Sequence, residues 1–163
     1  MKKQQAEALN QKPSVILPTT WIMNFNEQII DVVVMPFYLN NVDASVNANF
    51  LFGLLYQIKS KSVILNDELR QMMRDVSDLL VYAIDGGVDK RPDLILMYYP
   101  SKYDFYWFVA RIVGLLERME DERRDPDVAY VFDKLKKIMR GKGTEHLVKD
   151  KKIDTKTKLS YWV

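Results

Sequence analysis

The sequence predicts an all-α fold of tandem helical hairpins. The prediction rests on an internal repeat, on apolar residues at helical spacing and on helix-boundary signals. Asp43 is followed ten positions later by the tripeptide Gly-Leu-Leu at 53–55. Asp104 is followed ten positions later by the same tripeptide at 114–116, so the motif is written twice with the same internal spacing. A repeat of this length is typical of one supersecondary unit duplicated in tandem.

A second match links the apolar stripes of the helices that follow each motif. Its register is two positions shorter than that of the motif, and the change falls between the matched segments, where a loop tolerates a deletion. The matched pairs are Leu69 with Val128, Met72 with Val131, Met73 with Phe132, Val76 with Leu135, Leu79 with Ile138 and Leu80 with Met139. Each unit is therefore predicted to be a helix, a loop and a second helix.

The first helix of each hairpin is predicted to be buried. The segments 43–59 and 103–119 are apolar nearly all round, and Arg111 is the only charged residue between Phe105 and Leu116. A helix with apolar residues on all sides is typically enclosed by neighbouring elements.

The second helix of each hairpin is predicted to lie on the surface. Segment 67–84 has an apolar stripe and a charged face, with Asn66 as its N-cap and the glycine pair 86–87 as its stop. The last helix follows the Asp-Pro pair 125–126 and ends at Gly141. The order buried, exposed, buried, exposed predicts inner and outer helices, about two units of an α/α toroid or of an α-solenoid.

The chain is predicted to have three parts. Residues 1–35 form a peripheral N-terminal segment, and residues 36–140 hold the two hairpins, at 36–87 and 97–140. Residues 141–163 form a lysine-rich tail with weak patterning, in which the lysines are expected to face solvent.

The composition excludes several classes of site. A net charge of +2 gives no reason to expect a nucleic-acid partner, and the absence of cysteine excludes disulfides and thiolate chemistry. His146 is the only histidine and cannot form a typical zinc site alone, so it is expected to be an exposed bystander. We expect no metal and no cofactor. The sequence shows no signal peptide and no apolar run of about 18 residues, so no membrane contact is expected and the compartment stays open.

Three stretches resemble an uncharacterised group of animal proteins. They are 42–49 (Val-Asp-Ala-Ser-Val-Asn-Ala-Asn), 91–94 (Arg-Pro-Asp-Leu) and 98–108 (Tyr-Tyr-Pro-Ser-Lys-Tyr-Asp-Phe-Tyr-Trp-Phe), within a resemblance that covers about residues 30–120. The proteins of that group resemble α/α toroids of the terpenoid-cyclase or six-hairpin type. The resemblance implies inner and outer helices around a cavity, and it implies no particular reaction.

A toroid of this type closes with more than two hairpins. We therefore expect the chain to be a fragment or a minimal relative, and its end at Tyr161-Trp162-Val163 would suit the start of another packed element. Its partners would then be the remaining hairpins of a longer chain, or a second copy, because the cut edges would expose apolar surface.

Asp43 and Asp104 occupy equivalent positions at the start of the inner helices. One interpretation is a pair of catalytic carboxylates at a cavity mouth, as acid–base hydrolysis of a glycan requires. The other is that each aspartate is an N-cap, which a repeated helical unit explains directly. The sequence favours capping.

Residues near the N-termini of the inner helices are the natural ligand-binding positions of a toroid. The candidates are Asn41, Asn47, Tyr99, Tyr103 and Trp107. Aromatic rings beside carboxylates suit a sugar ring, although core packing explains many aromatics equally well. Three functions stay open: a module that is non-catalytic alone, a toroid protein that binds or cleaves a glycan, and a terpenoid-cyclase-like enzyme. The absence of the D-x-D-D and D-D-x-x-D patterns counts against the third.

Overall fold

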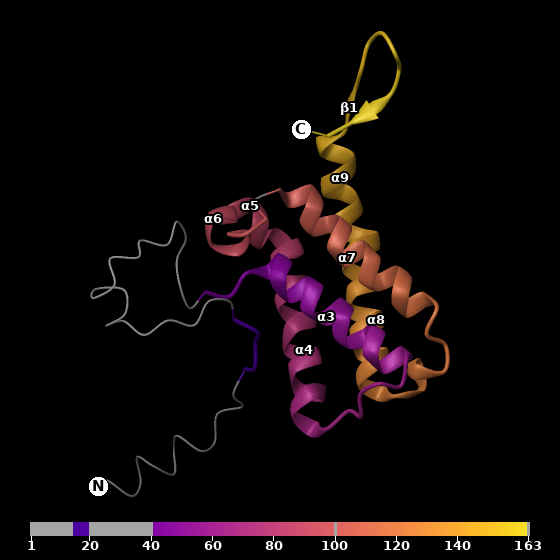
Figure 1. Ribbon diagram of the computed structural model, residues 1–163. Coiled ribbons are helices and arrows are strands. Elements are labelled where there is room, and N and C mark those ends of the chain that lie inside the picture. The colour runs from indigo at the N-terminus through magenta and orange to yellow at the C-terminus, as the bar shows by residue number, and fades with distance from the viewer. Residues whose placement is uncertain (1–14, 20–40, 100, 163) are drawn as a thin grey trace, which may run out of the picture.

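The computed structural model describes residues 15–19, 41–99 and 101–162, and its fold is an all-α arrangement of helical hairpins (Figure 1). The hairpin helices are α3 (Ala44–Lys59), α4 (Asp67–Tyr82), α7 (Lys102–Glu117) and α8 (Pro126–Ile138). The shorter elements are η1 (Ala83–Gly87), α5 (Val88–Lys90), α6 (Pro92–Ile95), η2 (Glu122–Arg124), η3 (Met139–Gly143), α9 (Thr144–Asp150), β1 (Lys152–Ile153) and β2 (Ser160–Tyr161). The four helices predicted from the sequence are confirmed.

The two hairpins lie side by side and are oriented alike. Helix α3 packs along α7 and α4 packs along α8, and the members of each pair run in the same direction in Figure 1. The core lies between these four helices, and Leu51, Phe105 and Ile112 are completely buried in it.

The repeat of the inner helices is present in their burial. Each of the two helices buries seven side chains, and these occupy the same positions in the register that superimposes the two Gly-Leu-Leu motifs. The pairs are Ala44 with Phe105, Ser45 with Tyr106, Asn47 with Phe108, Ala48 with Val109, Leu51 with Ile112, Leu54 with Leu115 and Leu55 with Leu116. Where α3 has alanine, α7 has phenylalanine or valine. The two helices therefore bury the same face, but the buried side chains of α7 are larger at these positions.

The inner helices are not enclosed on all sides, and this part of the prediction is wrong. Tyr56 on α3 is 59% exposed and Trp107 on α7 is 57% exposed. Two hairpins supply each inner helix with one inner and one outer neighbour, which leaves an apolar side of the helix in contact with solvent.

The outer helices repeat in a different register from the predicted one. The buried apolar residues are Met73, Val76 and Leu80 in α4, and Val128, Val131 and Leu135 in α8, and these two triplets match member by member. The sequence match had instead paired Val128 with Leu69, one helical turn before Met73. The predicted register is wrong because an apolar stripe moved by one turn still pairs apolar residues with apolar residues.

Each outer helix is followed by a short π-helical turn, η1 after α4 and η3 after α8. The two turns pack against each other. Gly86 in η1 has a φ of 122°, a conformation that glycine adopts without steric cost. Gly141 likewise gives η3 a non-helical backbone, and Lys142 forms an ion pair with Asp85 of η1. The glycines that were predicted to stop the outer helices therefore redirect the chain.

The outer helices are joined by ion pairs near their N-termini. The guanidinium of Arg70 donates to both oxygens of Asp125, at 2.8 and 2.7 Å, and to Asp127 at 2.8 Å. Asp125 is also the N-cap of α8, and Asn66 is the N-cap of α4, as the sequence predicted. The cap of one outer helix is thus fixed by a side chain of the other.

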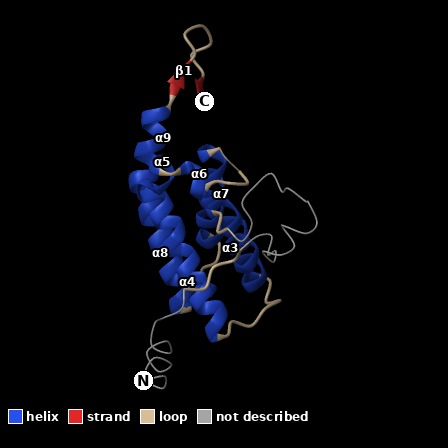
Figure 2. Cartoon of the chain, turned by 90° about the vertical axis from the view of Figure 1, so that its left-hand side faces the viewer, coloured by secondary structure: helices blue, strands red, loops and turns tan. Residues whose placement is uncertain are grey.

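Both ends of the described chain contact or extend the helical hairpins. Most of 1–35 lies outside the described residues, but 15–19 contacts α4, where the N–H of Ile16 donates to Asp75 at 2.8 Å. The predicted tail contains a helix, α9, which continues along the same side as α8 and leads to the β1–β2 hairpin (Figure 2).

Candidate functional site

The carboxylate of Asp43 is a structural anchor. The residue is 1% exposed and is the N-cap of α3, where its Oδ1 accepts from the N–H of Val46 at 2.9 Å and from the hydroxyl of Ser45 at 2.5 Å. Its Oδ2 accepts from the backbone N–H groups of Met97 at 2.5 Å and Tyr98 at 2.9 Å. These four donors hold the chain together, and burial leaves the carboxylate no access to a substrate.

Asn41 and Asn47 also hold segments of the chain in place. The Nδ2 of Asn47 donates to the carbonyls of Pro18 at 3.0 Å and Asp43 at 2.8 Å, inside the buried start of α3. The Nδ2 of Asn41 lies 3.4 Å from the sulfur of Met97. Both amides, predicted to bind a ligand, are therefore bonded to other parts of the chain.

Asp104 is not an N-cap, so the predicted equivalence with Asp43 is wrong. Ser101 caps α7, and its Oγ accepts from the backbone N–H of Asp104 at 3.3 Å. Relative to the repeat, α7 begins three positions earlier than α3, so Asp104 lies in its first turn. Its side chain is exposed, and no ion pair to it is found in the described part of the chain.

Tyr99 lies apart from the other candidate aromatics. Its ring packs edge-on against Phe108, with the centroids 5.3 Å apart, and the residue is 44% exposed. The ring of Phe108 also contacts Trp107, with the centroids 5.4 Å apart. Tyr99 therefore supports α7 and does not line the groove that the remaining candidates share.

Tyr103 and Trp107 do come together, in an aromatic groove. The groove has a volume of about 370 Å³. Its lining residues are Tyr103, Tyr106, Trp107 and Ala110 of α7, Met139 of η3, Leu147 of α9 and Trp162 after β2. The indole N–H of Trp162 donates to the carbonyl of Leu147 at 2.8 Å, which fixes the C-terminal wall of the groove.

A guanidinium group contacts the ring of Trp107 at the edge of the groove. The guanidinium of Arg111 lies 4.6 Å from the ring of Trp107 and 4.3 Å from the ring of Phe52 on α3. Its Nη2 also donates to Asn49 at 2.7 Å. Cation–π contacts of this kind orient the exposed indole and link the two inner helices.

A polar cluster that the sequence did not predict lies behind the groove. The hydroxyl of Tyr106 is 2.7 Å from Nδ1 of His146, and Nε2 of His146 is 3.9 Å from Asp89. Beside them, Lys102 forms an ion pair with Asp150 at 2.5 Å. His146 is therefore half-buried and bonded, and the expectation of an exposed bystander is wrong because 144–150 is helical and packs inward through Leu147.

The electrostatics of this cluster favour a structural role, in which it holds α9 to α7, over a catalytic role. Burial, together with the charges of Asp89 and Asp150, raises the pKa of Tyr106 to about 12. The hydrogen bond to Asp150 raises the pKa of Lys102, and the same bond lowers the pKa of Asp150. The phenol thus stays protonated and the ion pair stays charged, so the cluster fastens α9 to α7 and provides no activated nucleophile.

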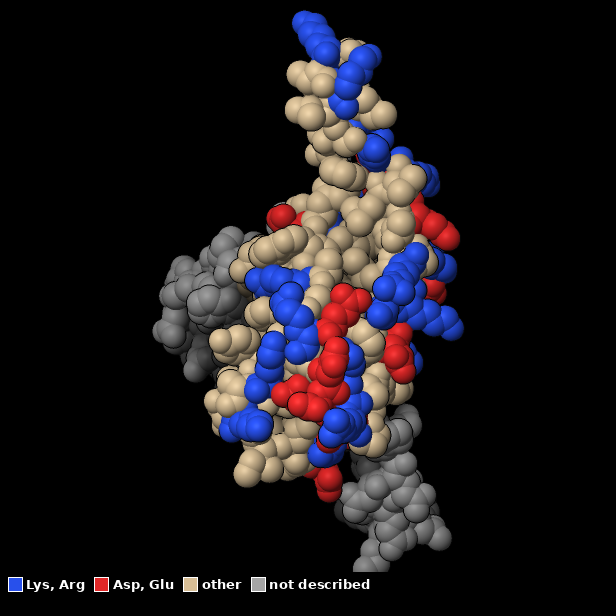
Figure 3. Space-filling model, turned by 90° about the vertical axis from the view of Figure 1, so that its right-hand side faces the viewer, with Lys and Arg blue, Asp and Glu red and all other residues tan. Residues whose placement is uncertain are grey.

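On the face shown in Figure 3, acidic side chains gather in a central strip and basic side chains flank it on both sides, so neither sign covers this face. Among the described residues, no group of three or more potential metal ligands is found, and no helix is both long and apolar enough to span a bilayer. The surface that brings predicted candidates together is therefore the aromatic groove.

Comparisons of this chain with protein-family models, with curated proteins and with solved structures gave no match.

Proposed function

We propose that this chain is a helical-hairpin module, non-catalytic alone, which acts by packing a further hairpin against the aromatic groove of α7. The proposal is supported by where the structure places the predicted site residues. Asp43 is engaged in structural hydrogen bonds, whereas Tyr103 and Trp107 line an apolar groove. Hydrophobic surface of this kind on a folded domain typically marks a contact site.

The groove lies between α7, η3 and α9, on the side of α7 that carries Tyr103 and Ala110. Tyr103 and Ala110 line the groove, and each precedes a core residue, Phe105 or Ile112, by two positions. Two residues correspond to about 200° around a helix, so the groove is opposite the face that packs into the core. A third hairpin placed there would continue the side-by-side order of the first two.

A second copy of the chain can provide such a hairpin, and this is the partner that we propose. Gly53 and Gly114 occupy equivalent positions, and a Cβ at either would meet nothing within 4 Å. Glycines at open positions of two inner helices allow another helix to approach closely. The array would resemble consecutive units of an α/α toroid.

Light scattering coupled to size exclusion tests this proposal. Wild-type protein should associate as its concentration rises, whereas Ala110→Glu, which puts a charge into the groove at an exposed position, should stay monomeric. Ser62→Glu adds the same charge in the exposed loop between α3 and α4 and should associate like wild type. A wild-type protein that is monomeric at every concentration would overturn the proposal.

Glycan binding is a second candidate, and one observation favours it. The exposed carboxylate of Asp104 lies on the same helix as Trp107, three residues away, beside an indole that is 57% exposed. A ring for stacking and a free carboxylate for hydroxyl groups are the two elements of a sugar-binding surface. The largely apolar walls of the groove favour the hairpin partner.

Titration with oligosaccharides, followed by tryptophan fluorescence, separates the two functions. A glycan ligand should change the emission of wild type but not of Trp107→Phe, and Asp104→Asn should weaken binding. Unchanged emission across a panel of neutral and acidic glycans would contradict this second function. It would not bear on self-association, which light scattering tests separately.

A further inference from the structure

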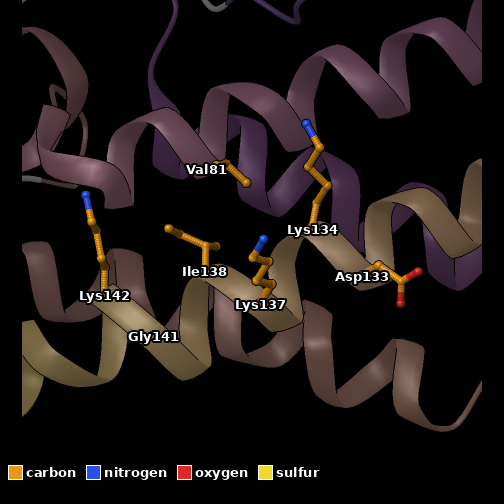
Figure 4. A pocket seen from close by; sticks show the side chains of 7 residues that line it. All are labelled: Val81, Asp133, Lys134, Lys137, Ile138, Gly141 and Lys142. Carbon is orange, nitrogen blue, oxygen red and sulfur yellow. The ribbon is translucent and has the colours of Figure 1, made fainter.

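A second hollow lies between the outer helices, away from the aromatic groove. It has a volume of about 470 Å³, within the range of small-molecule sites. Its lining residues are Val81 of α4, Asp133, Lys134, Lys137 and Ile138 of α8, and Gly141 and Lys142 of η3. We call it the lysine slot. Val81 and Ile138 point into it from opposite sides in Figure 4.

Ion pairs lie at the two ends of the lysine slot. Lys134 reaches across to Asp78, 2.9 Å away, and Lys142 reaches across to Asp85 of η1. In Figure 4 both lysines extend toward α4 and η1, on either side of Ile138. Eight residues separate them, a rise of about 12 Å along a helix. An occupant of the slot is therefore confined in length.

Lys137 lies between these ends and has no carboxylate partner among the described residues. Its side chain is exposed and lies over the gap in Figure 4. Asp133 lies one turn away and points outward in the same view. An unneutralised ammonium above an apolar floor is a combination that an amphiphilic anion complements, with charge at one end and hydrocarbon at the other.

Gly141 contributes the remaining space. A Cβ at this position would meet nothing within 4 Å, and the turn at η3 carries the backbone past the floor of the slot. Interruptions of this type in helices occur frequently at binding sites.

We propose that the lysine slot binds a small amphiphilic monocarboxylate, with the carboxylate on Lys137 and a medium-length alkyl or aryl body against Val81 and Ile138. A partner helix fits less well, because it would have to continue past the ion pairs at both ends. The proposal does not depend on the aromatic groove or on self-association.

Decanoate and its uncharged analogue decanol are suitable probes, followed by calorimetry and by ¹H–¹⁵N spectra. Decanoate should bind saturably below its micelle concentration and shift the amide of Gly141. Lys137→Met keeps the length of the side chain and removes its charge. It should weaken decanoate binding about tenfold or more, as expected for the loss of a charge-assisted hydrogen bond.

Three controls make the result specific. Lys151→Met removes an exposed lysine elsewhere and should leave binding unchanged, as should Trp107→Phe in the aromatic groove. Val81→Phe fills the slot without changing charge and should abolish binding. The proposal is overturned if decanol binds as tightly as decanoate, if Lys151→Met weakens binding as much as Lys137→Met, or if no saturable binding is observed.

Discussion

The carboxylate of Asp43 accepts a hydrogen bond from the backbone N–H of Tyr98 at 2.9 Å, across 55 residues of sequence. The same carboxylate caps α3 through Val46. One side chain therefore fixes both the start of the first inner helix and the segment that leads into the second. The contact sets how the two hairpins lie against each other.

Asp43→Ala should destabilise the fold by about 2–4 kcal/mol, because it removes an N-cap and leaves the half-buried N–H groups of Met97 and Tyr98 without their acceptor. Asp104→Ala should cost about 0.5 kcal/mol, as is usual for an exposed residue. Urea denaturation of both variants measures the difference. Equal losses for the two would contradict the assignment of Asp43 as the anchor and of Asp104 as a surface residue.

Gly53→Ala and Gly114→Ala should each stabilise the protein by about 1 kcal/mol, because alanine is the better helix former. Both glycines lie within helices and have open space at the Cβ position. Thermal unfolding of the single and double variants measures the gain. Because the glycines belong to different hairpins, the two gains should add. A loss of stability at either site would show that the tripeptide Gly-Leu-Leu is needed for packing.

Tyr106→Phe should change how stability depends on alkaline pH. The folded pKa of Tyr106 is about 12, against about 10 for an unfolded tyrosine. A raised pKa contributes stability that is complete below about pH 10 and is lost as pH rises through about 12. The difference in unfolding free energy between wild type and Tyr106→Phe should therefore shrink across this window.

Chemical denaturation at several pH values, with the ionisation of tyrosine followed by absorbance, measures this effect. The folded wild type should show a tyrosine component that ionises near pH 12, and that component should be missing from Tyr106→Phe. A difference between the two proteins that does not vary with pH would mean that Tyr106 is not protected by its contacts with His146 and the core.

The helices and the repeat of the inner pair could be predicted from the sequence because the residues that are buried are the apolar residues that recur at helical spacing. The buried positions of α3 recur in α7, and caps such as Asn66 and Asp125 have a local signature. The register of the outer pair could not be predicted, since a shift of one turn preserves an apolar stripe. Helix α9 was missed because it has seven residues and a single apolar residue, Leu147, packed against the core, which gives almost no periodic signal.

The candidate site was predictable only in part. Tyr103 and Trp107 are separated by one helical turn, so their shared surface follows from the helix itself. The role of Asp43 depends on Met97 and Tyr98, and that of His146 depends on Tyr106. Contacts between residues so far apart in the sequence have no counterpart in a local pattern.

The central claim is that the aromatic groove is where a second copy packs. Concentration-dependent ¹H–¹⁵N spectra test it most directly, because each backbone amide and each of the three indole N–H groups reports separately. We expect shifts on concentration at Tyr103, Trp107 and Ala110, and at the indole of Trp162, and no such shifts in Ala110→Glu. Spectra that superimpose at all concentrations, or shifts confined to other surfaces, would contradict the claim.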